Sequence, residues 1–263
     1  KIVARVMERL EEVAGEYKAA KPEAALPPYA KAVLASKPVV YWRLDDLNGP
    51  HARNAADGKE LGTFETQIAY YMQGPQAPAF PGLEADNRSA HFVGQRLLAK
   101  VPGLGPAYTV EMWFYNCMPT DARAVTGYLF SNGPLGDGLA VGGTVVGDGK
   151  LIFDTGGNPK SALFGKTKVP LRNWVPRESW HHVALVRNGH EVTIYLDGKP
   201  QPEISGQAAP PPASQDIVIG GRSDNRFNFE GRIDEVAIYS RALKAEEIAG
   251  HFQAAVGAGA ARK

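Results

Sequence analysis

The segment from Trp180 to Gly198 constrains the fold of this chain more than any other. Two apolar runs, His182–Val186 and Val192–Leu196, are separated by a few residues that include Asn188-Gly189. The second run alternates apolar and more polar residues, which is the period of a half-buried strand. An Asn-Gly pair between two such runs predicts a tight β-hairpin with a type I′ turn, whose two central residues both have positive φ. The segment therefore predicts a pair of antiparallel strands.

The rest of the chain repeats this pattern of short strands and turns. Glycine occurs 29 times and proline 20 times, and both interrupt regular structure. No long helices alternate with the strands, as a parallel sheet would require. We therefore predict an all-β chain folded as a two-sheet antiparallel sandwich. Further strands are predicted at Val39–Leu44, Ala90–Val93, Val110–Tyr115, Tyr128–Phe130, Leu151–Phe153, Ile217–Ile219 and Ile233–Tyr239.

Helices are predicted at both ends of the chain. Within residues 1–20, apolar residues recur at steps of three and four, which is the spacing of an amphipathic helix. An Ala- and Pro-rich linker follows, then a short helical turn around Tyr29–Ser36, and Ala245–Ala254 predicts a closing helix. We predict an N-terminal helix and linker at 1–36, a sandwich at 37–256 and a flexible tail at 257–263.

Charge and composition exclude some classes of partner. The formal net charge is only +1, and no cluster of Lys and Arg follows a strand or helix, so we expect no nucleic-acid partner. No apolar run is long enough to span a membrane.

Cys117 is the only cysteine and lies in an apolar stretch, where it is expected to be a packing residue. The chain starts at Lys1 rather than Met, so we expect a processed form or a fragment.

Four motifs in order resemble those of laminin-G-like domains, and together they cover residues 39–252. Trp180–Val186 with Ile194–Gly198 resembles the family's W-H-H-V-A and Y-V/L-D-G hairpin. The other three motifs are the opening strand Tyr41–Asp46, the central strand Thr109–Trp113 and the closing segment Phe229–Leu243. The resemblance implies a concanavalin A-like jelly roll. The combination is also similar to laminin-G modules in surface proteins of planctomycete-type bacteria, which implies an extracellular, periplasmic or cell-surface location.

The resemblance further implies a structural calcium ion. Related sandwiches often bind calcium where the opening and closing strands meet, and the ion takes roughly six to eight hard oxygens, many from backbone carbonyls. Asp234 matches the closing-strand aspartate of the motif. Asp45 or Asp46 on the opening strand is expected to supply a second ligand, and Gly94 a carbonyl.

Asp234 also has other interpretations. Strand alternation puts it on the same face as Val236 and Ile238, which is an unusual place for an unpaired carboxylate. Instead of binding calcium, it can form a salt bridge with Arg43 or Arg241, or cap a turn.

Carbohydrate binding needs exposed aromatic rings beside planar polar groups, because sugars stack their C–H faces on rings while Asn, Asp and Arg bond the hydroxyls. The alternative is that Trp174 is a core residue and the polar loop around residues 222–226 is merely solvated. The candidate ligand-binding residues are Trp174, Tyr128, Asn132, Arg222, Asp224, Asn225 and Arg226.

No enzyme motif is found, so we predict a protein that is not an enzyme. Glycoside hydrolysis needs two carboxylates roughly 5–10 Å apart, and the E-x-D-x-x-E strand of laminarinase-like enzymes is absent. Glu111 has no acidic partner two or four residues along its strand. His181 and His182 are adjacent on a strand, so they point to opposite faces and cannot readily share a metal ion.

These observations favour a non-catalytic binding or adhesion module for a carbohydrate or a cell-surface protein. The alternative is a structural spacer or docking domain of a larger protein, whose N-terminal helix contacts an upstream domain. A glycan-active enzyme is the third and least favoured hypothesis.

Overall fold

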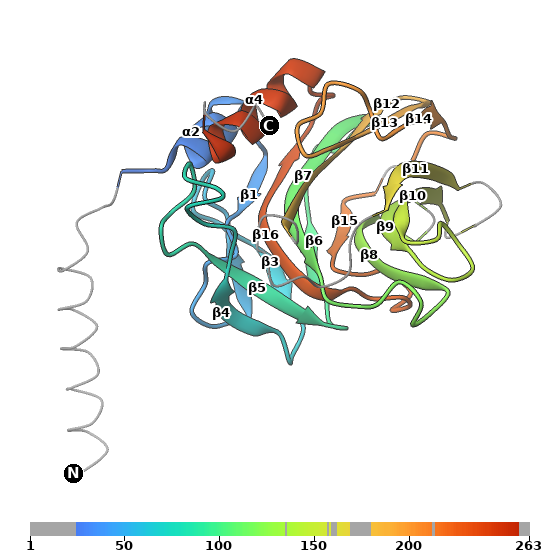
Figure 1. The fold of residues 1–263 in the computed structure, drawn as a ribbon, viewed down its shortest axis with the longest axis horizontal. Coiled ribbons are helices and arrows are strands. Elements are labelled where there is room, and N and C mark those ends of the chain that lie inside the picture. The colour runs from blue at the N-terminus through green and yellow to red at the C-terminus, as the bar shows by residue number, and fades with distance from the viewer. Residues whose placement is uncertain are drawn as a thin grey trace, which may run out of the picture.

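The computed structural model describes residues 25–134, 136–156, 158, 162–168, 180–211 and 214–257. Two antiparallel sheets pack face to face, and two helices lie outside one of them (Figure 1). The predicted all-β, two-sheet sandwich is confirmed. The helix predicted within residues 1–20 and the candidate Trp174 lie outside the described residues.

One sheet, called sheet A, contains the first and last strands of the sandwich. Its strands are β1 (Val40–Trp42), β4 (Ala69–Gln73), β5 (Arg88–Val93), β7 (Ala107–Asn116), β12 (Trp180–Asn188), β13 (Glu191–Leu196), β14 (Ile204–Gln207) and β16 (Glu230–Tyr239). Their order is β14-β13-β12-β7-β16-β5-β4, and β1 also pairs with β16. The opening and closing strands are therefore neighbours.

The other sheet, called sheet B, has eight strands among the described residues, as sheet A does. They are β2 (His51–Arg53), β3 (Glu60–Phe64), β6 (Leu97–Lys100), β8 (Val125–Asn132), β9 (Asp137–Gly142), β10 (Lys150–Thr155), β11 (Leu163–Lys168) and β15 (Asp216–Ile219). Their order is β11-β10-β9-β8-β15-β6-β3-β2. Strands β6 and β15 pair although more than a hundred residues separate them in the chain.

The predicted hairpin is confirmed as β12 and β13, but its predicted turn type is wrong. Asn188 pairs with Glu191, so the two central residues are Gly189 and His190. Gly189 has a φ of 61°, whereas His190 is not among the residues with positive φ. This arrangement fits a type II′ turn, which needs positive φ only at its first central position. The reason is that Asn188 continues the ladder of β12 with β7, so the turn begins one residue later.

A β-bulge in β16 overturns the predicted face of Asp234. The pairing of β16 with β7 shifts register between Asp234 and Ala237, and Glu235 has a φ of 52°. Val236 and Ile238 lie in the core between the sheets, but Asp234 pairs with a β7 residue whose side chain belongs to the outer face of sheet A. Because the bulge inserts an extra residue, simple alternation fails here.

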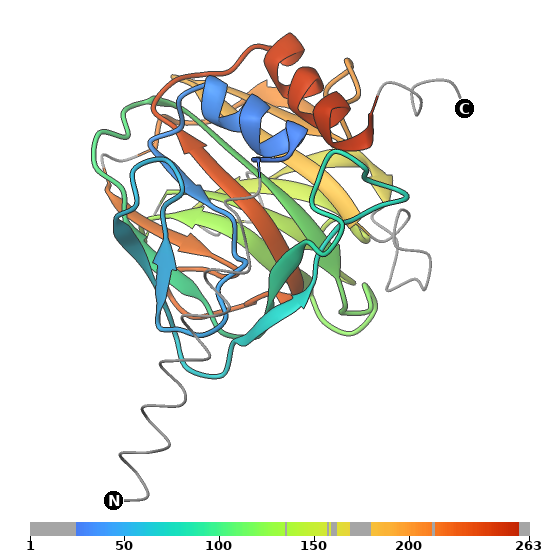
Figure 2. The same ribbon diagram turned by 90° about the vertical axis from the view of Figure 1, so that its left-hand side faces the viewer.

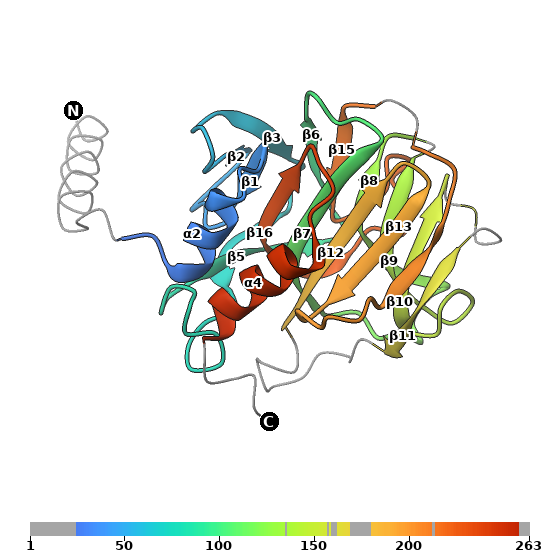
Figure 3. The same ribbon diagram turned by 90° about the horizontal axis from the view of Figure 1, so that it is seen from above.

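The outer face of sheet A is covered by helices α2 (Pro28–Ala35) and α4 (Ala245–Val256), which lie side by side (Figures 2 and 3). Helix α4 confirms the predicted closing helix. Gly82 connects the two helices, because its carbonyl accepts a hydrogen bond from Tyr29 N and its N–H donates to Ala255 O. A Cβ atom at Gly82 would lie 1.7 Å from the carbonyl oxygen of Ala254. The sheet face beneath the helices is therefore closed to ligands.

Among the described residues, no helix is both long and apolar enough to cross a membrane.

Candidate functional site

Within the described residues, no helix covers the outer face of sheet B, and one of its central strands brings an apolar side chain to the surface. On β6, Leu97 and Ala99 point into the core, so Leu98 points outward. Leu98 pairs with Thr63 on β3 and with Val218 on β15. Leu98 is 37% exposed. A strip of neighbouring residues, in which Leu98 and Val218 are apolar and Thr63 is polar, therefore crosses three strands that come from distant parts of the chain.

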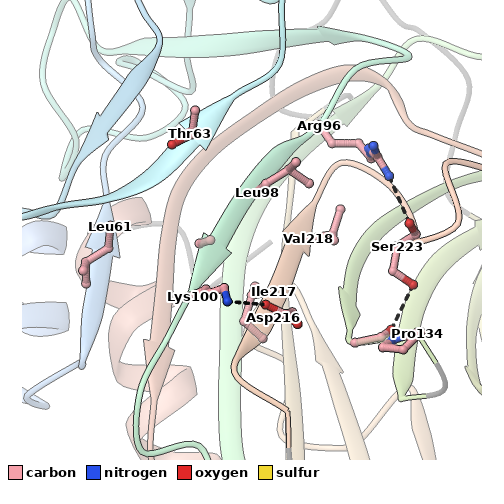
Figure 4. Close-up of a pocket in the computed structure, with 12 residues that line it drawn as sticks. Leu61, Thr63, Arg96, Leu98, Lys100, Pro134, Asp216, Ile217, Val218 and Ser223 are labelled. Atoms are coloured by element: carbon pink, nitrogen blue, oxygen red, sulfur yellow. Dashed lines mark hydrogen bonds and ion pairs between the residues drawn. The ribbon is translucent and has the colours of Figure 1, made fainter.

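This strip is the floor of a groove of about 550 Å³, which is shown in Figure 4. A groove of this size accommodates a small molecule or a few side chains of a peptide. Its apolar lining consists of Leu61, Leu98, Ala99, Ile217, Val218 and Pro134, and its polar lining of Thr63, Arg96, Lys100, Gly133, Asp216 and Ser223.

Arg96 makes one end of the groove rigid. Its guanidinium donates to both carboxylate oxygens of Glu65, at 3.0 and 2.5 Å. The same group donates to the carbonyl oxygens of Arg222 and Ser223, at 2.8 and 3.4 Å. The hydrogen bond with Arg96 lowers the pKa of Glu65 despite partial burial, so the carboxylate stays ionised. Arg96 therefore ties the 222–223 loop to sheet B and shapes the groove before a ligand arrives.

The other end of the groove is loosely held. Lys100 Nζ lies 3.9 Å from Asp216 Oδ1, and these side chains are 81% and 61% exposed. Such an exposed pair contributes little to folding stability and rearranges easily. Lys100 and Asp216 are therefore available to contact a ligand.

The lining chemistry indicates the kind of ligand. No aromatic ring lines the groove within the part of the chain that the structure describes. The Ser223 hydroxyl already donates to the Gly133 carbonyl, and the Arg96 guanidinium already donates to Glu65 and to the 222–223 loop. A sugar needs a ring to stack on and several free polar groups to bond its hydroxyls. The groove is therefore better suited to an aliphatic ligand surface than to a sugar ring.

A second, much smaller cavity adjoins the groove and shares Gly133, Pro134 and Ser223 with it. Its volume of about 10 Å³ fits a group the size of one water molecule. In contrast to the groove, it is polar. Its further lining residues are Tyr128, Ser131, Gly136, Asp137, Gly138, Asp154, Gly156 and Arg222.

The fold brings together two of the predicted ligand-binding residues, Tyr128 and Arg222, beside this cavity. The Arg222 guanidinium lies 5.2 Å from the centre of the Tyr128 ring, and it forms two hydrogen bonds to Asp224, at 3.1 and 2.7 Å. The Tyr128 hydroxyl donates to Asp154 Oδ2 at 2.5 Å. Burial and the neighbouring Asp154 raise the pKa of Tyr128 well above its usual value. The ring is itself buried, so it is not an open stacking platform.

The other predicted ligand-binding residues have separate positions. Asn132 is buried at the end of β8. Asn225 has a φ of 60° and accepts a hydrogen bond from Asn228, so it shapes its own turn. Arg226 is exposed, and its N–H donates to Asp224. The 222–226 loop therefore borders the two cavities chiefly through residues 222 and 223.

The predicted calcium ligand Asp234 is fully buried and already has hydrogen-bond donors. Asn87 Nδ2 donates to Asp234 Oδ2 at 2.7 Å, and Glu235 N donates to Oδ1 at 3.0 Å. The predicted alternative, a salt bridge from Asp234 to Arg43, is not found. Arg43 instead bonds Glu235, at 3.2 and 2.9 Å. Burial first, and the charge of Glu235 second, raise the pKa of Asp234.

The other predicted calcium ligands do not all converge on Asp234. Asp45 lies close enough that its charge contributes to the raised pKa of Asp234, and burial together with Asp45 raises the pKa of Asp46 to about 6. Gly94 lies near the opposite end of β5 from Asn87, and its carbonyl accepts a hydrogen bond from Asn228. In the part of the chain that is described, no three acidic, His or Cys side chains are placed to share a metal ion. These side chains alone therefore do not form a calcium site.

Glu111 and the two histidines have structural positions. Glu111 is fully buried beneath α4, where its carboxylate contacts His251 at 2.9 Å, Tyr239 at 2.5 Å and His182 at 3.2 Å. His181 lies on the opposite face of β12 and contacts Asp197 at 2.9 Å, as strand alternation predicts. A substrate cannot reach Glu111 without displacing the helix.

Sequence reasoning missed the groove residues. The only local signal is the run Leu97-Leu98-Ala99, in which an apolar residue occupies an outward position. Periodicity cannot show that Leu98 lies beside Val218, because that neighbour comes from a distant segment.

Comparisons with known proteins agree with this architecture. The model of the Concanavalin A-like lectin/glucanases superfamily matches residues 97–249. Adhesion G-protein coupled receptor D1 of Homo sapiens is 29% identical over 229 residues, which are 82% of this chain and 24% of the receptor. The chain thus spans about a quarter of the length of that relative.

Two solved structures have a similar fold. Domain 4 of AbnA, a GH43 extracellular arabinanase from Geobacillus stearothermophilus in complex with arabinotriose, has a TM-score of 0.58 and 18% identity. The match covers 82% of this chain and 98% of that one. The binding domain of Paraclostridial Mosquitocidal Protein 1 has a TM-score of 0.54 and 15% identity, and the match covers 84% and 52% of the two chains.

Proposed function

The chain belongs to the Concanavalin A-like lectin/glucanases superfamily, and on this basis we propose that it is a non-catalytic binding module whose ligand occupies the groove on sheet B. The observation that carries the proposal is the groove on this sheet face, in which Leu98 is exposed and lies beside the more deeply buried Val218. Burying one aliphatic side chain in such a groove contributes about 1.5–3 kcal/mol. The adhesion receptor and the toxin binding domain support a binding role.

A protein ligand that presents aliphatic side chains is the first candidate. The groove has an aliphatic floor, a rigid end at Arg96 and a movable charged pair at Lys100 and Asp216. A polar rim around an apolar centre is typical of sites that bind proteins.

A carbohydrate is the second candidate. It is supported by the arabinanase domain, which was solved with arabinotriose. The aliphatic lining of the groove favours a protein ligand over a carbohydrate.

Chemical-shift mapping tests the site with two probes. One probe is a blocked tripeptide, acetyl-Gly-norleucine-Gly-amide, and the other is arabinotriose. We expect the peptide to shift amide signals of β3, β6 and β15, and Leu98→Ser to weaken that binding. Leu47→Ser is the matched control, because Leu47 is also an exposed leucine but does not line the groove. Peptide shifts that map elsewhere, or that survive Leu98→Ser unchanged, contradict the proposal. Shifts only with arabinotriose favour the carbohydrate.

The non-catalytic part of the proposal is supported by the burial of Glu111 beneath α4. Hydrolysis of arabinan by the purified chain would contradict it.

Calcium binding is a separate proposal, supported by the family resemblance and by the closeness of Asp45, Asp46 and Asp234. Because the side chains alone do not form a ligand set, bound calcium would need backbone carbonyls as well. Thermal unfolding in saturating calcium and in excess EGTA tests the proposal. We expect calcium to raise the Tm of the native chain but not that of Asp45→Asn. Equal Tm values in both buffers contradict it.

We also propose an extracellular, periplasmic or cell-surface location, which is supported by the kinds of protein that the chain resembles. Contact with an upstream domain through residues 1–20 is likewise a proposal.

A further inference from the structure

A serine, a histidine and a glutamate form a hydrogen-bonded chain where helices α2 and α4 lie together over sheet A (Figure 3). Ser36 directly follows α2, His251 lies within α4, and Glu111 lies in β7. Ser36 Oγ is 2.9 Å from His251 Nε2, and His251 Nδ1 is 2.9 and 3.1 Å from the two carboxylate oxygens of Glu111. A hydroxyl, an imidazole and a carboxylate in this order are the arrangement that activates a serine nucleophile.

Glu111 determines which nitrogen of His251 carries the proton. Burial alone would raise the pKa of Glu111, but the charge of His251 and the contact with His182 lower it below its usual range. Because an ionised carboxylate has no proton to donate, Nδ1 of His251 carries the hydrogen that bonds Glu111. In neutral His251, Nε2 therefore has the free electron pair that accepts the Ser36 hydroxyl. This is the tautomer that a general base for Ser36 needs.

Only the serine of the three reaches the surface. Glu111 is fully buried and His251 is 3% exposed, whereas Ser36 is half-buried. Glu111 therefore acts only through His251, while a small reagent in solvent meets Ser36 first.

The backbone at Ser36 is not arranged for rapid turnover. The N–H of Ser36 donates to Val33 O at 3.1 Å, and the N–H of Lys37 donates to Leu34 O at 3.0 Å. These two N–H groups are therefore not free to form an oxyanion hole beside the hydroxyl. Attack on an activated acyl donor, which has a good leaving group, depends less on such stabilisation than hydrolysis of the serine ester that results. Acylation is therefore expected to be faster than deacylation.

We propose that Ser36 is an acyl-acceptor site, whose hydroxyl attacks the carbonyl carbon of an activated acyl donor such as a thioester or an aryl ester and retains the acyl group. Ser36 Oγ forms a bond to the acyl carbon while His251 Nε2 takes the hydroxyl proton. The bond from the acyl carbon to the leaving group then breaks, and the leaving group takes the electron pair and the proton from His251. Glu111 is a positioning residue. The site lies at sheet A, so it is separate from the groove on sheet B, and it requires no catalytic turnover.

The test uses p-nitrophenyl acetate as the acyl donor and the full chain as the acceptor. Release of p-nitrophenolate gives the rate, and fragmentation of peptides in a mass spectrometer locates the acetyl group. We expect a burst of one acyl group per chain, an acetyl group on Ser36 and only slow release afterwards. The position of this group in the native chain is informative even if a variant fails to fold.

Two variants and a matched control assign the burst. Ser36→Ala is expected to abolish it, and His251→Asn is expected to slow it by about a hundredfold or more, because the general base is lost. Ser240→Ala removes an exposed serine just after β16 and should keep the native burst. Thermal unfolding shows that each variant is folded before its rate is compared.

The pH profile separates a general base from a histidine that only ties the two helices together. Burial lowers the pKa of His251, but the charge of Glu111 outweighs burial and raises it above its usual value. The other groups that face His251 are Glu247, Arg241, Tyr239 and Ser36. Protonated His251 cannot accept the hydroxyl proton, so the burst rate should rise with pH through this pKa and then level off. A histidine with a purely structural role would give a rate that keeps rising with hydroxide concentration, as expected for His251→Asn.

The outcomes separate this inference from the proposed function. Acetylation confined to lysine side chains, or an equal burst in Ser36→Ala, overturns the acyl-acceptor site, while the groove function stands. A burst rate that never levels off with pH overturns the role of His251 and with it the activated serine. Sustained turnover that disappears in Ser36→Ala overturns the retained acyl group, and it also contradicts the non-catalytic part of the proposed function.

Discussion

The Nε atom of Arg187 lies 2.7 Å from Oδ2 of Asp137, and this fully buried ion pair joins sheet A to sheet B. The guanidinium also donates to Ala209 O at 2.5 Å, and Tyr108 donates to the same Asp137 oxygen at 2.6 Å. The ion pair is therefore a buried polar contact that connects the two sheets through a mainly apolar core.

Removing only one member of this pair is expected to be strongly destabilising. Arg187→Met leaves the Asp137 carboxylate buried without its cation, which costs about 3–5 kcal/mol in the free energy of unfolding. Urea unfolding measures this loss. The double variant Arg187→Met with Asp137→Leu should regain a large part of it, because no buried charge remains. As a control, Lys59→Met breaks an exposed pair with Asp57 and should change little. A single variant as stable as the native chain would show that the pair is not essential.

The contact between His251 and Glu111 predicts a fall in stability at alkaline pH. The buried Glu111 carboxylate raises the pKa of His251 above its usual value, although burial acts in the opposite direction. Because the folded pKa exceeds the unfolded one, the protonated His251 stabilises the fold fully below about pH 6.5. This stabilisation is lost as the pH rises through the folded pKa.

Thermal unfolding between pH 6 and pH 9 tests this dependence. The groups that face His251 are Glu111, Glu247, Arg241, Tyr239 and Ser36. We expect Tm to fall with pH in the native chain and to depend much less on pH in His251→Asn. His190→Asn removes a histidine in the hairpin turn and should keep the native slope. An identical slope for His251→Asn would refute the assignment.

Gly82 is predicted to be necessary for helix α4 to pack on the sandwich. Gly82→Ala places a Cβ atom 1.7 Å from the Ala254 carbonyl, and backbone cannot move aside as a flexible side chain would. Overpacking of this kind costs about 1–3 kcal/mol. Gly250→Ala is the matched control, because nothing lies within 4 Å of its added Cβ. In a helix this second change should stabilise by about 0.5–1 kcal/mol. Chemical denaturation compares the free energies of unfolding of the two variants. Equal values would contradict the close contact between residue 82 and the Ala254 carbonyl.

Arg96 is predicted to order the loop at the end of the groove. Arg96→Met removes the hydrogen bonds to Arg222 O and Ser223 O. We expect faster amide hydrogen exchange at Asn225, whose N–H donates to Arg222 O, and weaker binding of the norleucine peptide. Arg53→Met alters an arginine on β2 that does not line the groove, and it serves as the control. Unchanged exchange in Arg96→Met would mean that the loop is held by other contacts.

The fold could be predicted from the sequence to a large extent, because its signals are local. Alternation in Val192–Leu196 and the nearby Asn188-Gly189 predicted a hairpin, and the structure has one. The turn type was wrong, since pairing with β7 extends β12 by one residue. The face of Asp234 was also wrong, because a bulge near Glu235 interrupts the alternation.

Of the candidate site, only residues at its edge could be predicted from the sequence. The polar loop at 222–226 and Tyr128 were identified from residue type, and they do border the small cavity. The groove floor was not identified, because an outward leucine such as Leu98 is common on protein surfaces and carries no meaning alone.

The sequence by itself determined the all-β class, the hairpin and the closing helix, because hydrophobic period and turn residues act over a few neighbouring positions. Only the tertiary structure decided the groove and the cavity beside it. Leu98, Val218 and Ser131 come from three separate segments and become neighbours only when β6, β15 and β8 pair. Which strands pair depends on the packing of the whole core. The position of the candidate binding site therefore depends on that packing too.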